Sequence, residues 1–401
     1  MKQPRIRPFA ILASLFLISA LAGCGDQQVA NEAPAGPSWP AAEWPVSTPE
    51  AEGIDAAAIE ALISDIEGGL YGLVDHFLLI RSGKVVADHH FPHDYAAIAA
   101  QYDPTDHQYN YDHPEWHPYY RGTKLHTLQS VTKSVTSAAL GIAVDEGLIQ
   151  GVDVPAMSFF DAYEPDLSDP RKAAMTMEDL LTMRSGLDWN EMISYDDASN
   201  SCIQLEASDD WIRFVLGHPM REEPGTVFDY NSGASVLLGK IVGVATGQRV
   251  DHWAEERLFK PIGIADYYWK TTPGGEVDTE GGLYLSTHDL ARIGYLFLRG
   301  GVWDGEQVIS VEWVARSTAP TIPDIRPASD EQNDGYGYQW WVPRFEDDPT
   351  TVYAGLGYGG QFLMVVPEFD IVLVFNSWNI HESPERSTFL ALWERILPAV
   401  R

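Results

Sequence analysis

The stretch Leu128-Gln129-Ser130-Val131-Thr132-Lys133-Ser134 places a serine and a lysine three residues apart at the start of an apolar segment. Apolar residues recur at three- and four-residue spacing as far as Glu146, and Gly147 supplies a stop, so the pattern predicts a helix over 130–146. Residues three apart share a helix face, so the Lys133 amine can reach the Ser130 hydroxyl. The helix N-terminus would stabilise a developing anion there. S-x-x-K alone also fits an ordinary N-terminal serine beside a solvated lysine, so other motifs must decide.

Length and charge restrict the class of protein. The chain has 401 residues and 45% hydrophobic content, enough for one large catalytic unit or two lobes. Asp and Glu number 58 against 26 Lys and Arg, a formal charge of −32. This charge repels nucleic acid and anionic lipid, so we expect no nucleic-acid partner. An acidic, solvated surface is typical of saline or extracytoplasmic surroundings.

The N-terminus has the pattern of an export signal. Basic residues precede an apolar run over 9–21, which is short for a spanning helix. Leu21-Ala22-Gly23-Cys24 resembles a bacterial lipoprotein box, so residues 1–24 are predicted to be a signal peptide ending at a lipidated Cys24. Residues 25–46 are expected to be a flexible tether. We therefore expect a lipoprotein on the periplasmic face of a bacterial membrane, with the outer membrane slightly favoured because Gly25 follows the cysteine. Cys202 is the only other cysteine, so no disulfide framework is expected.

The domain itself is predicted to span 47–400 and to be α+β. A helix capped by Asp55 runs to about Glu67, and two β-rich runs, 76–80 and 84–90, are joined by a turn as a hairpin. Further β-rich runs follow at 336–342, 361–366 and 371–376, before a closing helix over about 385–397. These segments predict an antiparallel sheet flanked by helices, with a frame of about 47–130 and 330–400.

Between the two parts of the frame, residues of about 131–330 predict a mostly helical lobe. Thr176 and Asp179 have the spacing of a capping box, and helices are expected around 210–216, over 232–246 with Gly247 as the stop, and from Ser286 to Leu298. The chain order is therefore helix, hairpin, helical insertion, hairpin, helix.

The segment 91–127 is rich in His, Tyr, Asp and Pro. Eight of the twelve histidines fall between His76 and His126. His113 and His117 have the spacing of helical metal ligands, but Pro114 and Pro118 break such a helix. We therefore expect a polar loop beside the active site, with no metal and no organic cofactor.

Three motifs in order resemble one known group of enzymes. They are Ser130-Val131-Thr132-Lys133, then Pro224-Gly225-Thr226-Val227-Phe228-Asp229-Tyr230-Asn231-Ser232-Gly233, then Gly281-Gly282-Leu283-Tyr284 before Asp289-Leu290-Ala291-Arg292. The set is similar to the serine β-lactamase superfamily, and most similar to its class C β-lactamase, family VIII esterase and 6-aminohexanoate-dimer hydrolase branch. The resemblance covers about residues 47–397. It implies a β-lactamase/penicillin-binding-protein-like fold.

The resemblance also implies roles for individual residues. Ser130 matches the acylated nucleophile, Lys133 the lysine that helps to deprotonate it, and Tyr230 the tyrosine that exchanges protons with nucleophile and leaving group. The backbone N–H groups of Ser130 and Tyr358 would form the oxyanion hole. The physical chemistry agrees, since a tyrosine with an ordinary pKa of about 10 acts as a base only if a cation such as Lys133 stabilises its phenolate.

Two departures from the family pattern bear on substrate. Relatives usually have Tyr-x-Asn, whereas this chain has Tyr230-Asn231-Ser232, so Asn231 and Ser232 are both candidates for positioning substrate. The third motif, Lys-Thr-Gly or His-Thr-Gly in relatives, falls on Gly355-Leu356-Gly357 and has no cation. Gly357 and Gly359 remain candidates for positioning substrate.

These patterns predict a serine hydrolase that cleaves a small carboxylic ester or open-chain amide through an acyl-enzyme on Ser130. The missing cation disfavours β-lactams, because a charge-assisted contact with the substrate carboxylate is worth roughly 1.5–3 kcal/mol. The alternatives are a D-alanyl peptidase or weak class C-type β-lactamase, and a noncatalytic binding or sensing protein of the same fold. The natural substrate and the oligomeric state are left open by the sequence.

Overall fold

The computed structural model describes residues 38–101, 122–325, 334–345, 348–381 and 383–400. The predicted signal peptide with Cys24, and the histidines at 113 and 117, lie outside these residues. Among the described residues, the helices are all too short or too polar to cross a membrane.

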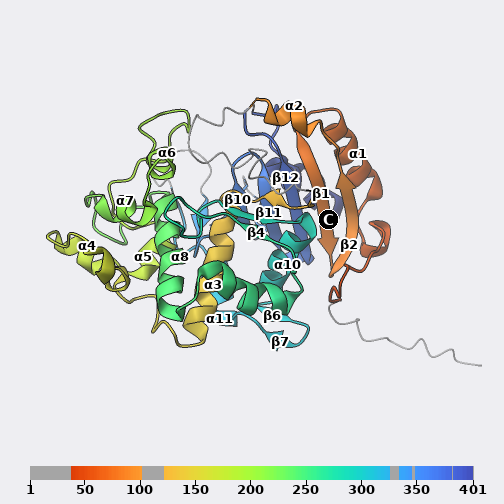
Figure 1. The fold of residues 1–401 in the computed structure, drawn as a ribbon. Helices are drawn as coiled ribbons and strands as arrows, with labels where there is room; N and C mark the ends of the chain where they lie inside the picture. The colour runs from red at the N-terminus through yellow and green to blue at the C-terminus, as the bar shows by residue number, and fades with distance from the viewer. Residues whose placement is uncertain (1–37, 102–121, 326–333, 346–347, 382, 401) are drawn as a thin grey trace, which may run out of the picture. The chain divides into compact units, whose positions relative to one another are not determined.

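An antiparallel sheet of seven strands forms the frame (Figure 1). Its spatial order is β2-β1-β12-β11-β10-β9-β8, so the first hairpin lies beside the last strand of the chain. The strands are β1 Val74–Arg81, β2 Lys84–His90, β8 Gly335–Tyr336, β9 Trp341–Val342, β10 Tyr353–Gly357, β11 Gln361–Val366 and β12 Ile371–Ser377. The predicted α+β class, the first hairpin and the strands at 361–366 and 371–376 are confirmed.

The single strand predicted over 336–342 is wrong. The chain instead makes two short strands, β8 and β9, joined by a tight turn. Gln339 has φ +61°, and its amide donates hydrogen bonds to the carbonyls of Leu180 and Leu181, 3.1 and 3.0 Å away. The turn passes so close to Ser317 that a Cβ on Gly337 would lie 2.1 Å from its carbonyl oxygen. These tertiary contacts override the β-rich pattern.

The sheet separates two apolar layers, because alternate side chains on its central strands point to opposite faces. Leu363 and Val365 of β11 belong to the layer shared with the lobe helices, whereas Met364 and Val366 belong to the layer under the terminal helices. Helix α1 (Ala56–Glu67) covers the second layer. Helices α3 (Val131–Asp145) and α10 (Thr287–Leu298) lie against the first.

Capping side chains begin several of the helices. Asp55, Thr176, Asp210, Asn231 and Ser286 each accept a hydrogen bond from the first turn of the helix that follows. The remaining helices are α2 Tyr95–Ala99, α4 Pro170–Ala174, α5 Met177–Leu181, α6 Ser201–Glu206, α7 Trp211–Gly217, α8 Ser232–Thr246, α9 Val250–Ala254, α11 Val311–Thr318, α12 Thr388–Ala391 and α13 Leu397–Val400.

Smaller elements complete the lobe and the C-terminus. Three short strands form a second sheet, and two form a hairpin: β3 His126–Thr127, β4 Tyr268–Trp269, β5 Leu283–Leu285, β6 Val302–Trp303 and β7 Glu306–Gln307. The predicted closing helix starts later than expected, at Thr388 after the capping residue Ser387, and contains a π-helical turn over Leu392–Ile396.

The predicted start of the domain, near Ser47, is too late. Trp44, within the expected tether, is buried, and the Arg292 guanidinium donates hydrogen bonds to the carbonyls of Ala41 and Ala42, 3.0 and 3.1 Å away. Residues 45–47 also pair with Val85, which covers part of the β2 edge. Any flexible tether therefore ends before about residue 38.

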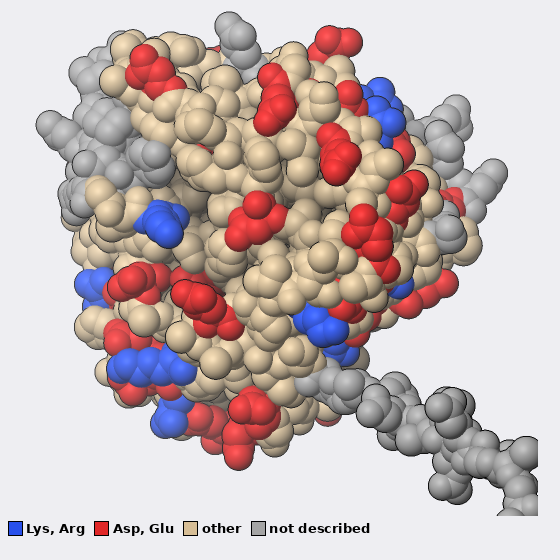
Figure 2. Space-filling model, turned by 90° about the vertical axis from the view of Figure 1, so that its right-hand side faces the viewer, with Lys and Arg blue, Asp and Glu red and all other residues tan. Residues whose placement is uncertain are grey.

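Negative charge is spread over the face of the molecule that Figure 2 shows. Figure 2 shows one face of the molecule, on which Asp and Glu side chains outnumber Lys and Arg and are scattered over the surface. On this face, the distribution agrees with the solvated acidic surface expected from the sequence.

Candidate active site

Ser130 lies at the N-terminal cap of α3, in the position predicted from the sequence. The helix start is fixed to β5, because the Leu128 N–H donates to the Leu283 carbonyl (3.0 Å) and the Leu283 N–H donates to the Thr132 hydroxyl (3.2 Å). Gln129, immediately before the serine, has φ +47°, which is uncommon for a residue with a Cβ. A strained residue next to a candidate nucleophile is typical of active sites.

Lys133 is buried and has three close polar partners. Its Nζ lies 2.9 Å from Ser130 Oγ, 2.7 Å from the carbonyl oxygen of Glu280 and 3.0 Å from Glu280 Oε2. The Lys133 side chain is 1% exposed and that of Glu280 5%. The lysine is therefore a buried component of the site, and the alternative of a solvated lysine does not hold.

The partners of Lys133 restrict where its protons can be. A backbone carbonyl and an ionised carboxylate only accept hydrogen bonds, so two Nζ–H groups point at Glu280. The third position faces Ser130. As an ammonium, Lys133 donates a third proton to Ser130 Oγ; as an amine, it presents a lone pair to the Ser130 hydroxyl. A proton can therefore pass between Ser130 and Lys133 without rearrangement of either side chain.

The charge of Lys133 is strongly favoured. Burial alone would lower the pKa of Lys133, but electrostatic interaction with Tyr230, Glu280 and Glu191 outweighs burial and raises the pKa above its ordinary value. The ammonium is therefore the resting form near neutral pH.

Tyr230 lies just before α8 and is buried beside Lys133. The Lys133 Nζ is 5.3 Å from the centre of its ring, and the Trp341 ring stacks on it at 5.6 Å. Burial raises the pKa of Tyr230, and the Lys133 ammonium and a hydrogen bond with Ser130 offset only part of this effect. The two groups interact so closely that they must titrate as a pair.

Glu280 and Glu191 are site residues that our sequence analysis missed. Glu280 directly precedes the Gly281-Gly282 motif, so its place beside that motif was an available signal. Glu191 comes from a loop with no local pattern, and only the tertiary fold brings it to the site. Burial raises the pKa of Glu191, while Lys133 and Ser232 lower it.

Glu191 also holds Ser232, one of the predicted positioning residues. The Ser232 N–H donates to Glu191 Oε2 (2.7 Å) and the Ser232 hydroxyl donates to Oε1 (2.6 Å). Asn231 accepts a hydrogen bond from the Ala234 N–H (2.9 Å) as the cap of α8. Both side chains are buried and bonded within the protein, so their observed contacts are structural ones.

Strand β10 brings the predicted oxyanion segment to the start of α3. Gly357 approaches so closely that a Cβ there would lie 2.4 Å from the Leu128 carbonyl oxygen and 3.1 Å from Gln129 Cβ. Tyr358 follows directly, so its backbone lies next to the segment that carries Ser130. Only glycine at 357 permits this approach.

Gly355, Gly359 and the side chain of Tyr358 make packing contacts in this strand and the turn after it. A Cβ on Gly355 would lie 2.8 Å from Val131 Cγ1, so a longer side chain could not be added there without displacing α3 or β10. Gly359 has φ +78° in the turn after Tyr358, and a Cβ there would lie 2.3 Å from Ile380. The Tyr358 side chain is half exposed and packs on Tyr195, with ring centres 5.3 Å apart.

Over most of its length, the chain is similar to proteins of one known enzyme group. A family model described as Beta-lactamase matches residues 59–391. The chain is 26% identical over 349 residues to a 6-aminohexanoate-dimer hydrolase of Paenarthrobacter ureafaciens, covering 83% of this chain and 80% of that protein. A putative 6-aminohexanoate-dimer hydrolase from Bacillus anthracis has a similar structure, with a TM-score of 0.65 at 20% identity over 87% of this chain and 85% of that one. A family VIII carboxylesterase has a TM-score of 0.62 at 15% identity over 88% and 98%. These matches confirm the predicted β-lactamase/penicillin-binding-protein-like fold: the chain belongs to the beta-lactamase family and is a serine hydrolase of the serine β-lactamase superfamily.

Proposed function

We propose that the protein hydrolyses a carboxylic ester or an open-chain amide through an acyl-enzyme on Ser130. The observation that carries this proposal is the contact of 2.9 Å between Lys133 Nζ and Ser130 Oγ, in a buried site that also contains Tyr230. An oxygen nucleophile with a basic group at hydrogen-bond distance is the geometry that nucleophilic catalysis requires.

The reactive form is the one in which the Lys133–Tyr230 pair has lost one proton to solvent. In the first step, Ser130 Oγ attacks the substrate carbonyl carbon and gives its proton to this deprotonated pair. The carbonyl oxygen becomes an oxyanion, which the backbone N–H groups of Ser130 and Tyr358 would stabilise. The bond to the alcohol or amine then breaks, and the pair returns the proton to that leaving group. A water molecule releases the acyl group from Ser130 by the same proton transfers in reverse order.

The charge of the site favours a neutral acyl group. Two buried carboxylates, Glu191 and Glu280, surround one ammonium, and the strand 355–357 carries no cation. A substrate carboxylate near Ser130 would therefore be repelled and would have no charged partner on that strand. This argument favours simple esters and linear amides over penicillins, and one relative is itself named as a hydrolase of a 6-aminohexanoate dimer.

We further propose that the enzyme is exported and held at a bacterial membrane by lipid on Cys24. The support is the basic and apolar N-terminal pattern that ends in Leu21-Ala22-Gly23-Cys24. The proposed substrate would then be a small molecule of the cell envelope or of the medium.

A substrate panel tests the catalytic proposal. Purified protein and a Ser130→Ala variant are compared on a short-chain nitrophenyl ester, a linear anilide and nitrocefin, and each is treated with a fluorophosphonate probe. We expect the wild type to hydrolyse the ester or anilide much faster than nitrocefin, and to be labelled at Ser130. Faster hydrolysis of nitrocefin would support the β-lactamase or peptidase alternative. No labelling and no turnover of any substrate would support a noncatalytic binding protein.

A further inference from the structure

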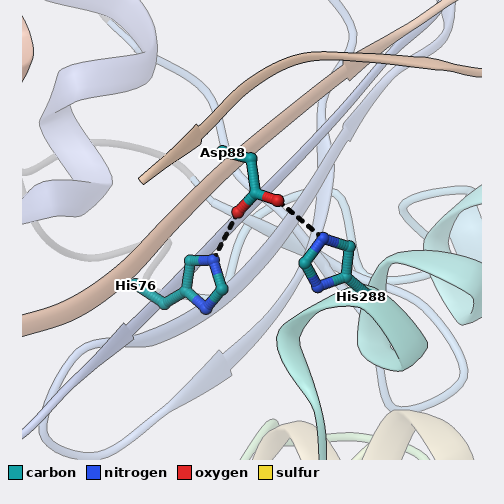
Figure 3. Close-up of side chains that lie close together, drawn as sticks. All are labelled: His76, Asp88 and His288. Atoms are coloured by element: carbon teal, nitrogen blue, oxygen red, sulfur yellow. Dashed lines mark hydrogen bonds and ion pairs between the residues drawn. The ribbon is translucent and has the colours of Figure 1, made fainter. Parts of the chain in front are cut away.

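Three metal-binding side chains meet on the sheet face next to α10, outside the candidate active site. His76 comes from β1, Asp88 from β2 and His288 from the first turn of α10 (Figure 3). His76 Nε2 lies 2.7 Å from Asp88 Oδ1, and His288 Nε2 lies 2.9 Å from Asp88 Oδ2. One ligand atom from each residue lies within 4.8 Å of the other two. The cluster therefore connects the β1–β2 hairpin to helix α10, whose His288 lies 200 residues after Asp88 in the sequence.

A chain of hydrogen bonds with a fixed direction leads to this cluster. It begins at Gln361, whose Nε2 donates to the backbone carbonyls of Ser377 and Tyr358. Because carbonyls only accept, the Gln361 amide can have only one orientation, with Oε1 toward Asn376. The Asn376 Nδ2 donates to this oxygen at 3.2 Å, so the Asn376 Oδ1 must point the other way.

The next two hydrogen bonds determine which ring nitrogen of His76 carries a proton. Asn376 Oδ1 accepts from the Thr287 hydroxyl at 2.8 Å, and this bond uses the only hydroxyl proton. The Thr287 oxygen also lies 3.0 Å from His76 Nδ1 and can only accept there. His76 Nδ1 must therefore carry a proton, and Nε2 is the nitrogen presented to Asp88.

This arrangement is the one that metal-binding histidines have. Such a histidine almost always donates its second ring N–H to a fixed acceptor, which sets the tautomer and the ring orientation. With Nδ1 protonated, a neutral His76 presents a lone pair to a carboxylate oxygen 2.7 Å away. These two electron-rich atoms repel each other unless a cation lies between them.

We propose that His76, Asp88 and His288 bind a divalent transition-metal ion of the zinc class, through two imidazole nitrogens and one carboxylate. Imidazole ligands favour zinc, nickel, copper or cobalt over magnesium and calcium. Ligand atoms at about 2.1 Å from a tetrahedral zinc are about 3.4 Å apart, so the contacts of 2.7 and 2.9 Å must open by roughly 0.5–0.7 Å. The side chains of Asp88 and His288 are 40% and 38% exposed, which leaves them room to do so. Three protein ligands leave a fourth position for water.

The ion would stabilise the fold, because it would join strand β2, at the edge of the sheet, to the start of α10. Binding to the folded state alone raises the midpoint of thermal unfolding in proportion to the logarithm of ion concentration. This role does not depend on the proposed hydrolase activity.

Metal titration of the full chain tests the proposal. The protein is treated with a chelator, dialysed and titrated with Zn²⁺ by calorimetry and with Co²⁺ by visible absorption. We expect one ion per chain, a rise in the unfolding midpoint, and cobalt d–d bands typical of imidazole and carboxylate ligands. His288→Ala should weaken binding by more than about tenfold, and Thr287→Val, which removes only the acceptor of the Nδ1–H, by about 10–100-fold.

His89→Ala is the matched control. His89 is also on β2 and is similarly exposed, but it lies near Glu67 and does not contact the cluster. This variant should bind metal like the wild type. The proposal is overturned if the wild type binds no ion with defined stoichiometry, or if the His288→Ala protein, shown to be folded by circular dichroism, binds as tightly as the wild type. The cluster would then be a protonated His–Asp–His ion pair only.

Discussion

Replacement of Glu280 by glutamine tests the electrostatic role of the buried carboxylate that pairs with Lys133. Glutamine preserves size and can still accept a hydrogen bond from Lys133, but it removes the negative charge 3.0 Å from Nζ. The backbone carbonyl of residue 280, at 2.7 Å, is unchanged by the substitution. The change therefore isolates charge from position.

The size of the expected change in the pKa of Lys133 follows from the distance between its Nζ and the Glu280 carboxylate. Two unit charges 3.0 Å apart in an effective dielectric of about 20 interact by about 5.5 kcal/mol, which is an upper limit because the amide dipole remains. A close opposite charge typically shifts a pKa by about 1–3 units. Because Glu280 favours the charged form of Lys133, its loss lowers the pKa of the lysine. We expect the acidic limb of the kcat/KM profile to move by about 1–3 units toward lower pH.

The assay is a pH–rate profile from about pH 5 to pH 10 on a neutral nitrophenyl ester, with thermal unfolding measured at each pH. Glu276→Gln is the matched control, because Glu276 lies in the same segment but pairs with Lys240 at 2.6 Å. Its profile should match the wild type. An unchanged limb in a folded Glu280→Gln protein would refute the conclusion that Glu280 sets the protonation of Lys133. A shift toward higher pH would refute it equally.

Three further changes test other parts of the site and the anchor. Tyr230→Phe should lower kcat by about 10²–10⁴ with little change in the unfolding midpoint, since it removes only the proton-transfer group; an equal loss of stability and activity would argue for a structural hydroxyl. Gly357→Ala should reduce turnover and destabilise the fold by about 1–3 kcal/mol, measured by urea unfolding, because its Cβ would lie 2.4 Å from the Leu128 carbonyl oxygen. Gly217→Ala, where a Cβ meets nothing within 4 Å, is its control and should be close to neutral. Cys24→Ser should move the protein from the membrane fraction to the soluble fraction without altering its catalytic rate, and membrane association that survives would refute the anchor.

Local chemistry explains why much of the fold could be predicted from the sequence. Helix α8 spans the predicted residues 232–246, because the side-chain cap that Asn231 supplies and the left-handed Gly247 act within a few residues of themselves. The first hairpin turn is equally local, since Ser82 and Gly83 both have positive φ. Ser130 and Lys133 are three residues apart on one helix, so their contact required no knowledge of the rest of the chain.

Tertiary structure decided what depends on segments far apart in the sequence. Glu191 and Glu280 reach the site from loops whose paths are set by packing. Glu191 has no local sequence signal, and the place of Glu280 before Gly281 does not show that its carboxylate is buried beside Lys133. The turn within 336–342 exists because Gln339 bonds to the end of α5, more than 150 residues earlier. Asn231 and Ser232 resembled substrate contacts in sequence, yet in the fold their polar groups bond to Ala234 and Glu191. The sequence shows which side chains can act as nucleophile, base or ligand. Their partners, their burial and therefore their pKa values depend on the three-dimensional packing of the whole domain.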